Sequence, residues 1–343
     1  MRVKVARPGE LGPGEAEVWA KCQRATAAGH TPFLSLTFAR AVDAARPSAR
    51  VAVVEDGGEI TAFLPFERGA GGIGKPIGDP VNDLQGLLTT GAPVDARRVV
   101  KGAGLRGWRF IAAPAGQAAL APHHYEDGPT EAPVISLAEG YEAYLQGLSS
   151  SLRSESRRKR RGLERQFGPV RLEWNSTDPA HLRKLIEWKS GKYHSARELF
   201  SGDPTVTAMM EGLAHSEHED CRGAVNVLLA GDRPVAVNIG LLGPRGLTGW
   251  SVSYDRELGK YSPGTMLVFA IAEEAAARGI PLIDLGYGQD RYKFSLANDS
   301  LPLAGGAVWV SRAEKTARHL YRRLHQARAA AAKPASPPGN SQP

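Results

Sequence analysis

Three short strands, a helix and a fourth strand follow one another in the second half of the chain, and this order constrains the fold most. Apolar runs separated by glycine-containing turns predict strands at 224–230, 234–242 and 247–254. The segment 263–278 predicts a helix, and 280–285 predicts a further strand. Helices are also predicted at 137–148 and 313–329, and a strand at 307–311. A meander followed by a helix and another strand indicates a mixed α/β (α+β) fold.

The strand at 280–285 runs directly into two glycines and a polar cluster. Gly286 and Gly288 at a strand end let another backbone or a ligand approach closely. Asp290, Tyr292 and Lys293 follow at once, where α/β proteins usually carry their chemistry. An ordinary charged loop would look the same, so both interpretations stay open at this point.

The length and composition indicate folded domains of ordinary size. The chain has 343 residues, 42% of them hydrophobic and 23% charged. A proline-rich stretch predicts domains at 1–135 and 136–329, followed by a disordered Ala/Pro-rich tail at 330–343. We expect a cytoplasmic protein, because we see no signal peptide, no apolar run of about 18 residues and only two isolated cysteines, Cys22 and Cys221.

Much of the net charge of +7 lies in one predicted helix, from Ser151 to Gln166. Its cations are Arg153, Arg157, Arg158, Lys159, Arg160, Arg161 and Arg165. Such a helix is often a solvated surface, and as a functional element it could bind nucleic acid, an anionic membrane or a phosphorylated acceptor. No aromatic residue is interleaved, which argues against stacking on single-stranded nucleic acid.

The segment Asp-Leu-Gly-x-Gly-x-Asp-x-Tyr-Lys at 284–293 resembles the signature of the CelD-like (cellulose-biosynthesis) group of GNAT acyltransferases, which is related to the FemAB aminoacyltransferases. The resemblance implies a GNAT fold for the second half. The first half has predicted helices at 15–28 and 35–45 and a hairpin at 51–66. On this resemblance, the first half would be a degenerate GNAT-like domain in tandem with the GNAT domain of the second half.

The resemblance also implies where acyl-CoA binds. GNAT enzymes hold the coenzyme A pyrophosphate at the N-terminus of the helix that follows the meander. The residues that would border acyl-CoA there are Ser262, Gly264 and Thr265. The thioester would enter a gap between two splayed strands, beside Gly286 and Gly288. The family's Gln/Arg-x-x-Gly-x-Gly/Ala loop is absent in strict form, and 256–259 matches it only in part.

Direct acyl transfer requires a nucleophile that loses its proton, a donor to the thioester oxygen and an acid for the leaving thiolate. On this resemblance, Tyr292 is the candidate acid. Lys293 would stabilise negative charge or bind an anionic substrate. Asp290 would be a base or a clamp for the substrate amine.

Acceptor-binding residues are predicted on two helices. Lys189 and Tyr193 share a helical face and would line the acceptor cleft. On the basic helix, Arg157, Arg158 and Arg161 would bind an anionic acceptor, because the related acyltransferases also carry a basic helix at this point.

We therefore predict an acyltransferase that moves an acyl group, expected to be acetyl, from acetyl-CoA or another acyl-CoA directly to an amine or hydroxyl. The expected acceptor is a small or lipid-linked anionic precursor of the cell envelope or of a polysaccharide, met at the inner face of the membrane. No metal and no cysteine nucleophile are expected. Three alternatives stay open: FemAB-like aminoacyl transfer from tRNA, long-chain N-acylation of a lipid amine, and a non-catalytic accessory or nucleic-acid-binding protein that retains the fold.

Overall fold

The computed structural model describes residues 1–26, 28–125, 130–192, 200, 202–288, 290–311 and 316. The helices and strands of the first half are β1 (Arg2–Ala6), α1 (Pro13–Ala25), α2 (Leu36–Ala45), β2 (Ala49–Asp56), β3 (Glu59–Arg68), β4 (Ile73–Pro76), β5 (Leu88–Thr89), α3 (Ala96–Gly102) and β6 (Gly107–Pro114). Strand β7 (Thr130–Ser136), helix α4 (Tyr141–Gly147) and the basic helix α5 (Ser150–Phe167) lead into the second half.

The second half begins at β8 and contains the predicted meander. Its elements are β8 (Val170–Glu173), α6 (Pro179–Lys192), α8 (Pro204–Ala214), β9 (Glu217–His218), β10 (Cys221–Ala230), β11 (Arg233–Gly243), β12 (Gly246–Tyr254), α9 (Pro263–Ala277), β13 (Leu282–Asp284), α10 (Arg291–Leu296) and β14 (Asp299–Trp309). The meander is β10–β11–β12, with antiparallel pairing throughout.

The two halves repeat the same order of elements. In the first half, antiparallel strands β1–β2–β3–β4 are followed by α3 and by β6, which pairs with β4 in parallel. In the second half, antiparallel strands β8–β10–β11–β12 are followed by α9 and by β13, which pairs with β12 in parallel. Within the described residues, helices also lie between the first and second strand of each unit: α1 and α2 in the first half, α6 and α8 in the second. The fold is therefore an internal duplication.

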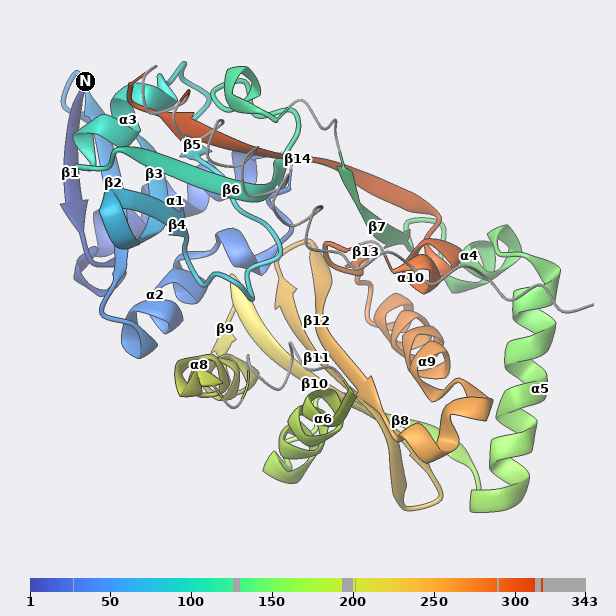
Figure 1. Ribbon diagram of the computed structural model, residues 1–343. Coiled ribbons are helices and arrows are strands. Elements are labelled where there is room, and N and C mark those ends of the chain that lie inside the picture. The colour runs from blue at the N-terminus through green and yellow to red at the C-terminus, as the bar shows by residue number, and fades with distance from the viewer. Residues whose placement is uncertain are drawn as a thin grey trace, which may run out of the picture.

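The halves exchange their final strands. Strand β7 follows the first half in sequence but pairs with β13 of the second half, whereas β14 follows the second half but pairs with β6 of the first. Because β7 and β14 also pair with each other, one continuous sheet crosses the molecule in the order β1-β2-β3-β4-β6-β14-β7-β13-β12-β11-β10-β8 (Figure 1). The predicted boundary between residues 135 and 136 falls inside β7, and the domain division itself stays a prediction.

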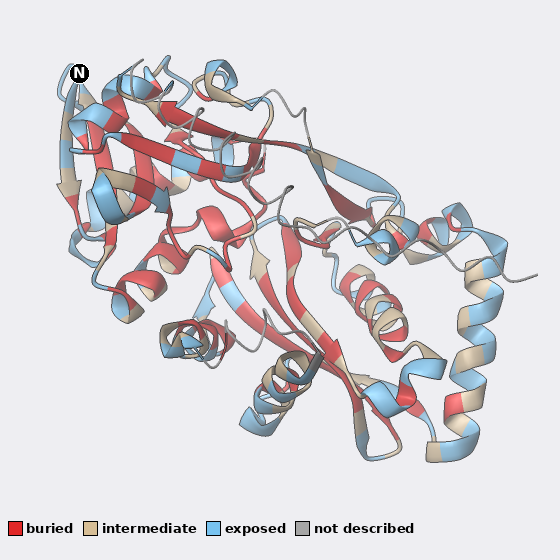
Figure 2. Cartoon of the chain, in the orientation of Figure 1, coloured by how far each residue is buried: buried red, intermediate tan, exposed pale blue. Residues whose placement is uncertain are grey.

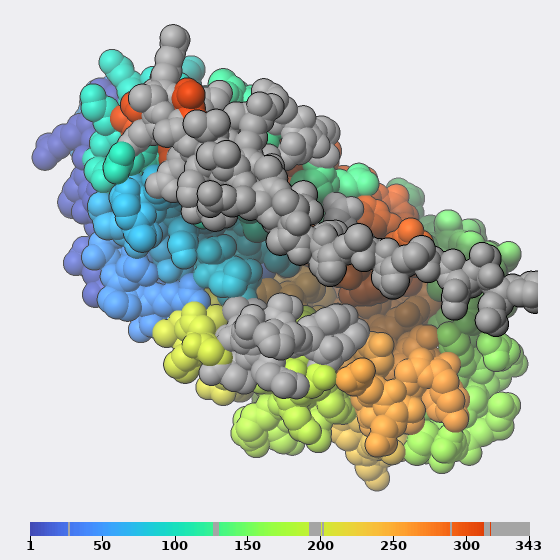
Figure 3. Space-filling model, in the orientation of Figure 1, coloured from blue at the N-terminus to red at the C-terminus, as the bar shows by residue number. Residues whose placement is uncertain are grey.

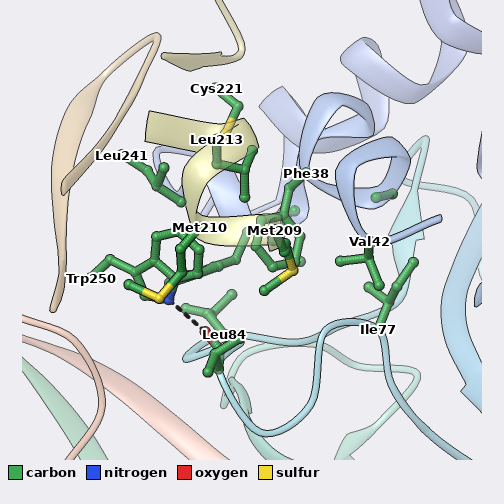
Figure 4. Packing of buried hydrophobic residues seen from close by; sticks show 14 of the residues in the cluster. Phe38, Val42, Ile77, Leu84, Met209, Met210, Leu213, Cys221, Leu241 and Trp250 are labelled. Atoms are coloured by element: carbon green, nitrogen blue, oxygen red, sulfur yellow. Dashed lines mark hydrogen bonds between the residues drawn. The ribbon is translucent and has the colours of Figure 1, made fainter. Parts of the chain in front are cut away.

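A shared hydrophobic core holds the halves together. Met209 and Met210 of α8 pack with Phe38 of α2 and with Trp250 of β12 (Figure 4). The indole N–H of Trp250 donates to the carbonyl oxygen of Val81 in the first half at 2.8 Å. Figure 2 shows buried residues on the strands of both halves, and Figure 3 shows the first half lying directly against α8.

Most predicted elements are present with shifted ends. The helix expected at 137–148 starts only at Tyr141, because the preceding Gly140 has φ +87°, which interrupts helical geometry. The strand expected at 307–311 is the end of the longer β14. The predicted C-terminal helix 313–329 and the tail 330–343 lie outside the described residues, apart from Thr316.

A buried arginine links the first half to α8. The guanidinium of Arg46 contacts Glu67 at 3.0 Å and Asp203 at 2.8 Å, and it donates to the carbonyl oxygen of Asp79 at 2.7 Å. Glu67 also accepts from the backbone N–H of Gly78 at 2.9 Å. This network fixes the start of the loop 77–87, which leads toward the second half.

We predict that Arg46→Ala lowers the free energy of unfolding by about 3 kcal/mol, because it leaves the Glu67 carboxylate buried without its partner. Urea unfolding measures the change. Arg97→Ala, which removes an exposed arginine of α3, is the control and should change stability by less than about 0.5 kcal/mol. Equal effects of the two substitutions would contradict the role assigned to the network.

Candidate active site

The parallel strands β12 and β13 diverge after two paired residues. Leu247 pairs with Ile283 and Thr248 with Asp284, after which β13 ends while β12 continues along β11 to Tyr254. The chain then turns away at Gly286 and Gly288, with φ +78° and +144°. Only glycine adopts both values readily, so the sequence places its glycines where the two strands separate.

Helix α9 begins next to β12 with an open N-terminus. Ser262 occupies the position before the helix with φ +53°, and its side chain makes no capping hydrogen bond to the helix. Its hydroxyl oxygen instead accepts from the ammonium group of Lys159 of α5 at 2.8 Å. Gly264 packs against the ring of Tyr254, since a Cβ there would lie 3.2 Å from a ring carbon. The helix end, with its partial positive charge and a lysine beside it, favours an anion.

The corresponding place in the first half is closed. The N-terminus of α3 is capped by the carboxylate of Asp95, which accepts from the N–H groups of Arg97 and Arg98 at 2.9 and 3.2 Å. Beside the parallel pair β4–β6, side chains of Leu105 and Trp108 lie 2.7 and 3.0 Å from where a Cβ on Gly74 would be. A negative charge therefore caps the helix end of the first half, whereas the corresponding helix end of the second half has no side-chain cap.

A carboxylate from the first half reaches the gap beside β13. A Cβ on Gly286 would lie 2.7 Å from Oδ2 of Asp83 and 3.7 Å from Nζ of Lys293. The ammonium group of Lys293 donates to the carbonyl oxygens of Gly286 and Tyr287, both at 3.2 Å. Asp83 and Lys293 therefore lie against the same face of the turn that ends β13.

The charged groups that act on Asp83, a residue of the first half, all come from the second half. Burial raises the pKa of the Asp83 carboxyl to about 7; Lys293 and Lys189 act against this shift, and Asp284 reinforces it. Lys189 of α6 also donates to the hydroxyl oxygen of Ser251 at 2.8 Å. Asp284 is buried, and its Oδ1 accepts from the N–H of Gly286 at 2.8 Å.

The loop 77–87 holds Asp83 firmly in this position. Asn82 donates to the carbonyl oxygen of Ile77 at 2.7 Å and accepts from the N–H of Leu84 at 2.9 Å. Gln85 donates to the carbonyl oxygen of Asn82 at 2.7 Å and accepts from two N–H groups of β6. With the Trp250 bond to the same loop, these contacts make it a rigid arm.

The three predicted catalytic residues lie in different environments. Lys293 is half-buried against Gly286, whereas Asp290 and Tyr292 are exposed at the start of α10, Tyr292 by 41%. Lys189 lies near Asp83, and Tyr193 lies outside the described residues. The roles of these side chains stay predictions.

Sequence analysis missed Asp83 and Asp284. A signal for Asp284 was present, because a carboxylate between Ile283 and Leu285 of an apolar strand must be buried and needs a partner. Asp83 gave no such signal, since its loop has no periodic pattern.

Two cavities of about 440 and 350 Å³ lie elsewhere, around Asn175 and Gly223, and share no residue with this cluster. Within the described part of the chain, no group of acidic, histidine or cysteine side chains could hold a metal ion.

One family model matches the part of the chain that carries the uncapped N-terminus of α9. Residues 150–294 match the family model of the acetyltransferase (GNAT) domain. No curated protein matched the chain.

Solved structures resemble nearly the whole chain. FemX shares 9% identity, with 90% of this chain and 96% of that chain covered and a TM-score of 0.55. A tandem GNAT protein from the clavulanic acid biosynthesis pathway shares 12%, with 90% and 99% covered and a TM-score of 0.51. L-PGS from Bacillus licheniformis shares 11%, with 92% and 97% covered and a TM-score of 0.50. The predicted fold class, an α/β fold of two GNAT-like domains in tandem, is confirmed; the CelD-like group stays a prediction.

We predict that Gly286→Ala destabilises the protein by about 2 kcal/mol more than Gly279→Ala does. Both glycines have a similar positive φ, +78° and +71°, so both substitutions carry the strain of left-handed backbone, about 1 kcal/mol. A Cβ meets Asp83 only at Gly286, whereas nothing lies within 4 Å at Gly279. Chemical denaturation of both variants measures the difference, and equal losses would contradict the close contact between Asp83 and Gly286.

Proposed function

We propose that the protein is an acyl-CoA-dependent acyltransferase whose second half alone binds the donor. The observation that carries this proposal is the contrast between the duplicated helix ends. The N-terminus of α9 is open, next to Lys159 and diverging strands, whereas the N-terminus of α3 is capped by Asp95. The match of residues 150–294 to the acetyltransferase (GNAT) domain supports the same assignment.

In this proposal the pyrophosphate of coenzyme A lies at Ser262, Gly264 and Thr265. Pro263 has no N–H, so the helix offers the free N–H of Gly264 together with the Lys159 ammonium group. The pantetheine arm follows the gap between β12 and β13, which brings the thioester to Gly286 and Gly288.

Transfer is direct, without an acyl-enzyme. Both cysteines are buried, and burial raises the pKa of Cys22 to about 11 and of Cys221 to about 12, so neither supplies a thiolate nucleophile. Lys293, whose ammonium group donates to the carbonyl oxygen of Gly286, is the proposed group that stabilises the negative charge on the thioester oxygen. Tyr292 remains the proposed acid for the thiolate. Acetyl is the proposed acyl group, and an amine or hydroxyl of an anionic envelope or polysaccharide precursor is the proposed acceptor.

We predict that calorimetry with acetyl-CoA finds one site per chain. Lys159→Ala should weaken binding about tenfold, because it removes a charged donor beside the pyrophosphate. Asp95→Ala, at the equivalent helix of the first half, should leave the affinity unchanged. Two sites per chain would contradict the proposal, as would binding of tRNA in place of acetyl-CoA.

The arginine face of α5 points away from this site. Leu163 is buried and Lys159 turns toward Ser262, whereas Arg157, Arg158 and Arg161 are exposed on the opposite side of the helix. The described residues include no ion-pair partner for these three side chains. A small acceptor at the gap would not reach them, so we assign them to an extended anionic partner rather than to the acceptor.

An anionic membrane surface fits this face best. The arginines form a strip one helix wide. Acidic side chains lie near it, since Glu142 and Glu273 act on Tyr141 together with Arg160 of α5. Such a strip is narrow for a nucleic-acid footprint. A strip of arginines needs only a plane of phosphates, and each arginine near that surface contributes about 1 kcal/mol to binding. Among the described residues no helix has the length and apolarity to span a membrane, so contact would be peripheral.

We predict that Arg157→Gln/Arg158→Gln/Arg161→Gln lowers partitioning onto phosphatidylglycerol vesicles on the order of 100-fold, as expected for three lost phosphate contacts. Arg97→Gln/Arg98→Gln/Lys101→Gln removes the same charge from α3 and is the matched control. Vesicle co-sedimentation at low salt measures both variants. Equal losses of vesicle binding in the two variants would contradict membrane contact by α5. Binding of the wild type to tRNA but not to vesicles would also contradict it.

A further inference from the structure

The arm 77–87 places one carboxylate of the first half at the diverging strands of the second. Oδ2 of Asp83 lies against the Cα of Gly286, and the residue is half-buried. Gly286 itself follows β13 by two residues, at the point where the thioester would lie. No other residue of this loop has an ionisable side chain except Asp79, whose carbonyl oxygen is held by Arg46.

We infer that Asp83 is the general base for acyl transfer, an inference that rests on the proposed function. Asp83 accepts the proton of the acceptor amine or hydroxyl as that nitrogen or oxygen bonds to the thioester carbon. The C–S bond then breaks with its electron pair on sulfur. The proton passes from Asp83 to the thiolate, directly or through Tyr292, which yields free coenzyme A and restores the carboxylate.

The groups that face Asp83 suit this role. Lys293 of α10 and Lys189 of α6 are the cations, and Asp284 of β13 is the anion. Asp284 in turn faces His30, whose Nε2 lies 3.6 Å from its Oδ2. A base works best when its pKa is close to the working pH, and burial raises the pKa of Asp83 to about 7.

The other carboxylates near the gap are less suited. Asp284 is only 2% exposed, and its Oδ1 is held by the N–H of Gly286, so an acceptor cannot reach it. Asp290 precedes α10 and is exposed, and its Oδ2 lies 3.7 Å from where a Cβ on Gly288 would be. Because its carboxylate is more exposed, it lacks the burial that raises the pKa of the Asp83 carboxyl. Asp83 lies against Gly286 from the first half and, as a residue, is less buried than Asp284.

The test uses acetyl-CoA with water as the acceptor and follows release of free thiol from pH 5.5 to 8.5. The wild-type rate should rise with pH and level off above about 7, the pKa of Asp83. Asp83→Asn should remove this rise of the rate with pH and lower the rate at pH 8 about 100-fold. Asp232→Asn, an exposed turn residue, is the matched control and should keep the wild-type profile.

A second measurement does not depend on turnover. Folded Asp83 retains its proton up to about pH 7, whereas the unfolded carboxyl loses it near pH 3.8. Wild-type stability therefore declines from pH 4 to pH 7, and Asp83→Asn removes that decline. The urea midpoint of Asp83→Asn should rise relative to wild type over this interval and then stay constant.

The outcomes separate this inference from the proposed function. If calorimetry shows acetyl-CoA binding but Asp83→Asn keeps the pH step, Asp83 is not the base and the donor site stands. If the step disappears in Asp290→Asn instead, Asp290 is the base. If the wild type does not bind acetyl-CoA, the proposed function and this inference both fail.

Discussion

The pairing of β14 with both β6 and β7 is the constraint on which the rest of the structure depends. It joins two sheets into one, and with the exchange of β7 it ties the end of each half to the other half. The shared core around Met209, Phe38 and Trp250 then forms between fixed sheets. Because the halves cannot shift independently, a loop of the first can hold a side chain at a defined place in the second.

Duplication followed by divergence explains the arrangement of the site. Each half has a parallel strand pair and a helix that starts beside it, the geometry that can receive an anion. In the first half Asp95, Leu105 and Trp108 fill this place. In the second half the helix end has no side-chain cap, and Lys159 lies beside it. The first half also contributes the arm that carries Asp83 to Gly286.

The features predicted from the sequence are those set by local patterns. The meander, α9 and the turn at Gly286 follow from apolar periodicity and from glycine at positive φ. The strand exchange and Asp83 could not be predicted, because they depend on contacts between segments far apart in the chain; Asp83 and Gly286 are about 200 residues apart. The side of α5 that carries the arginines could be predicted in part from the sequence, because Leu152, Leu163 and Phe167 mark the opposite, inner face of the helix.

The central claim is that the donor binds at α9 and β13 and not at the equivalent elements of the first half. Hydrogen exchange with and without saturating acetyl-CoA tests it most directly. The account predicts slower exchange at the amides of Gly264, Thr265, Gly286 and Gly288 and no change at Arg97 and Arg98. Protection at α3, or no protection of the α9 N-terminus while acetyl-CoA is bound, would contradict it.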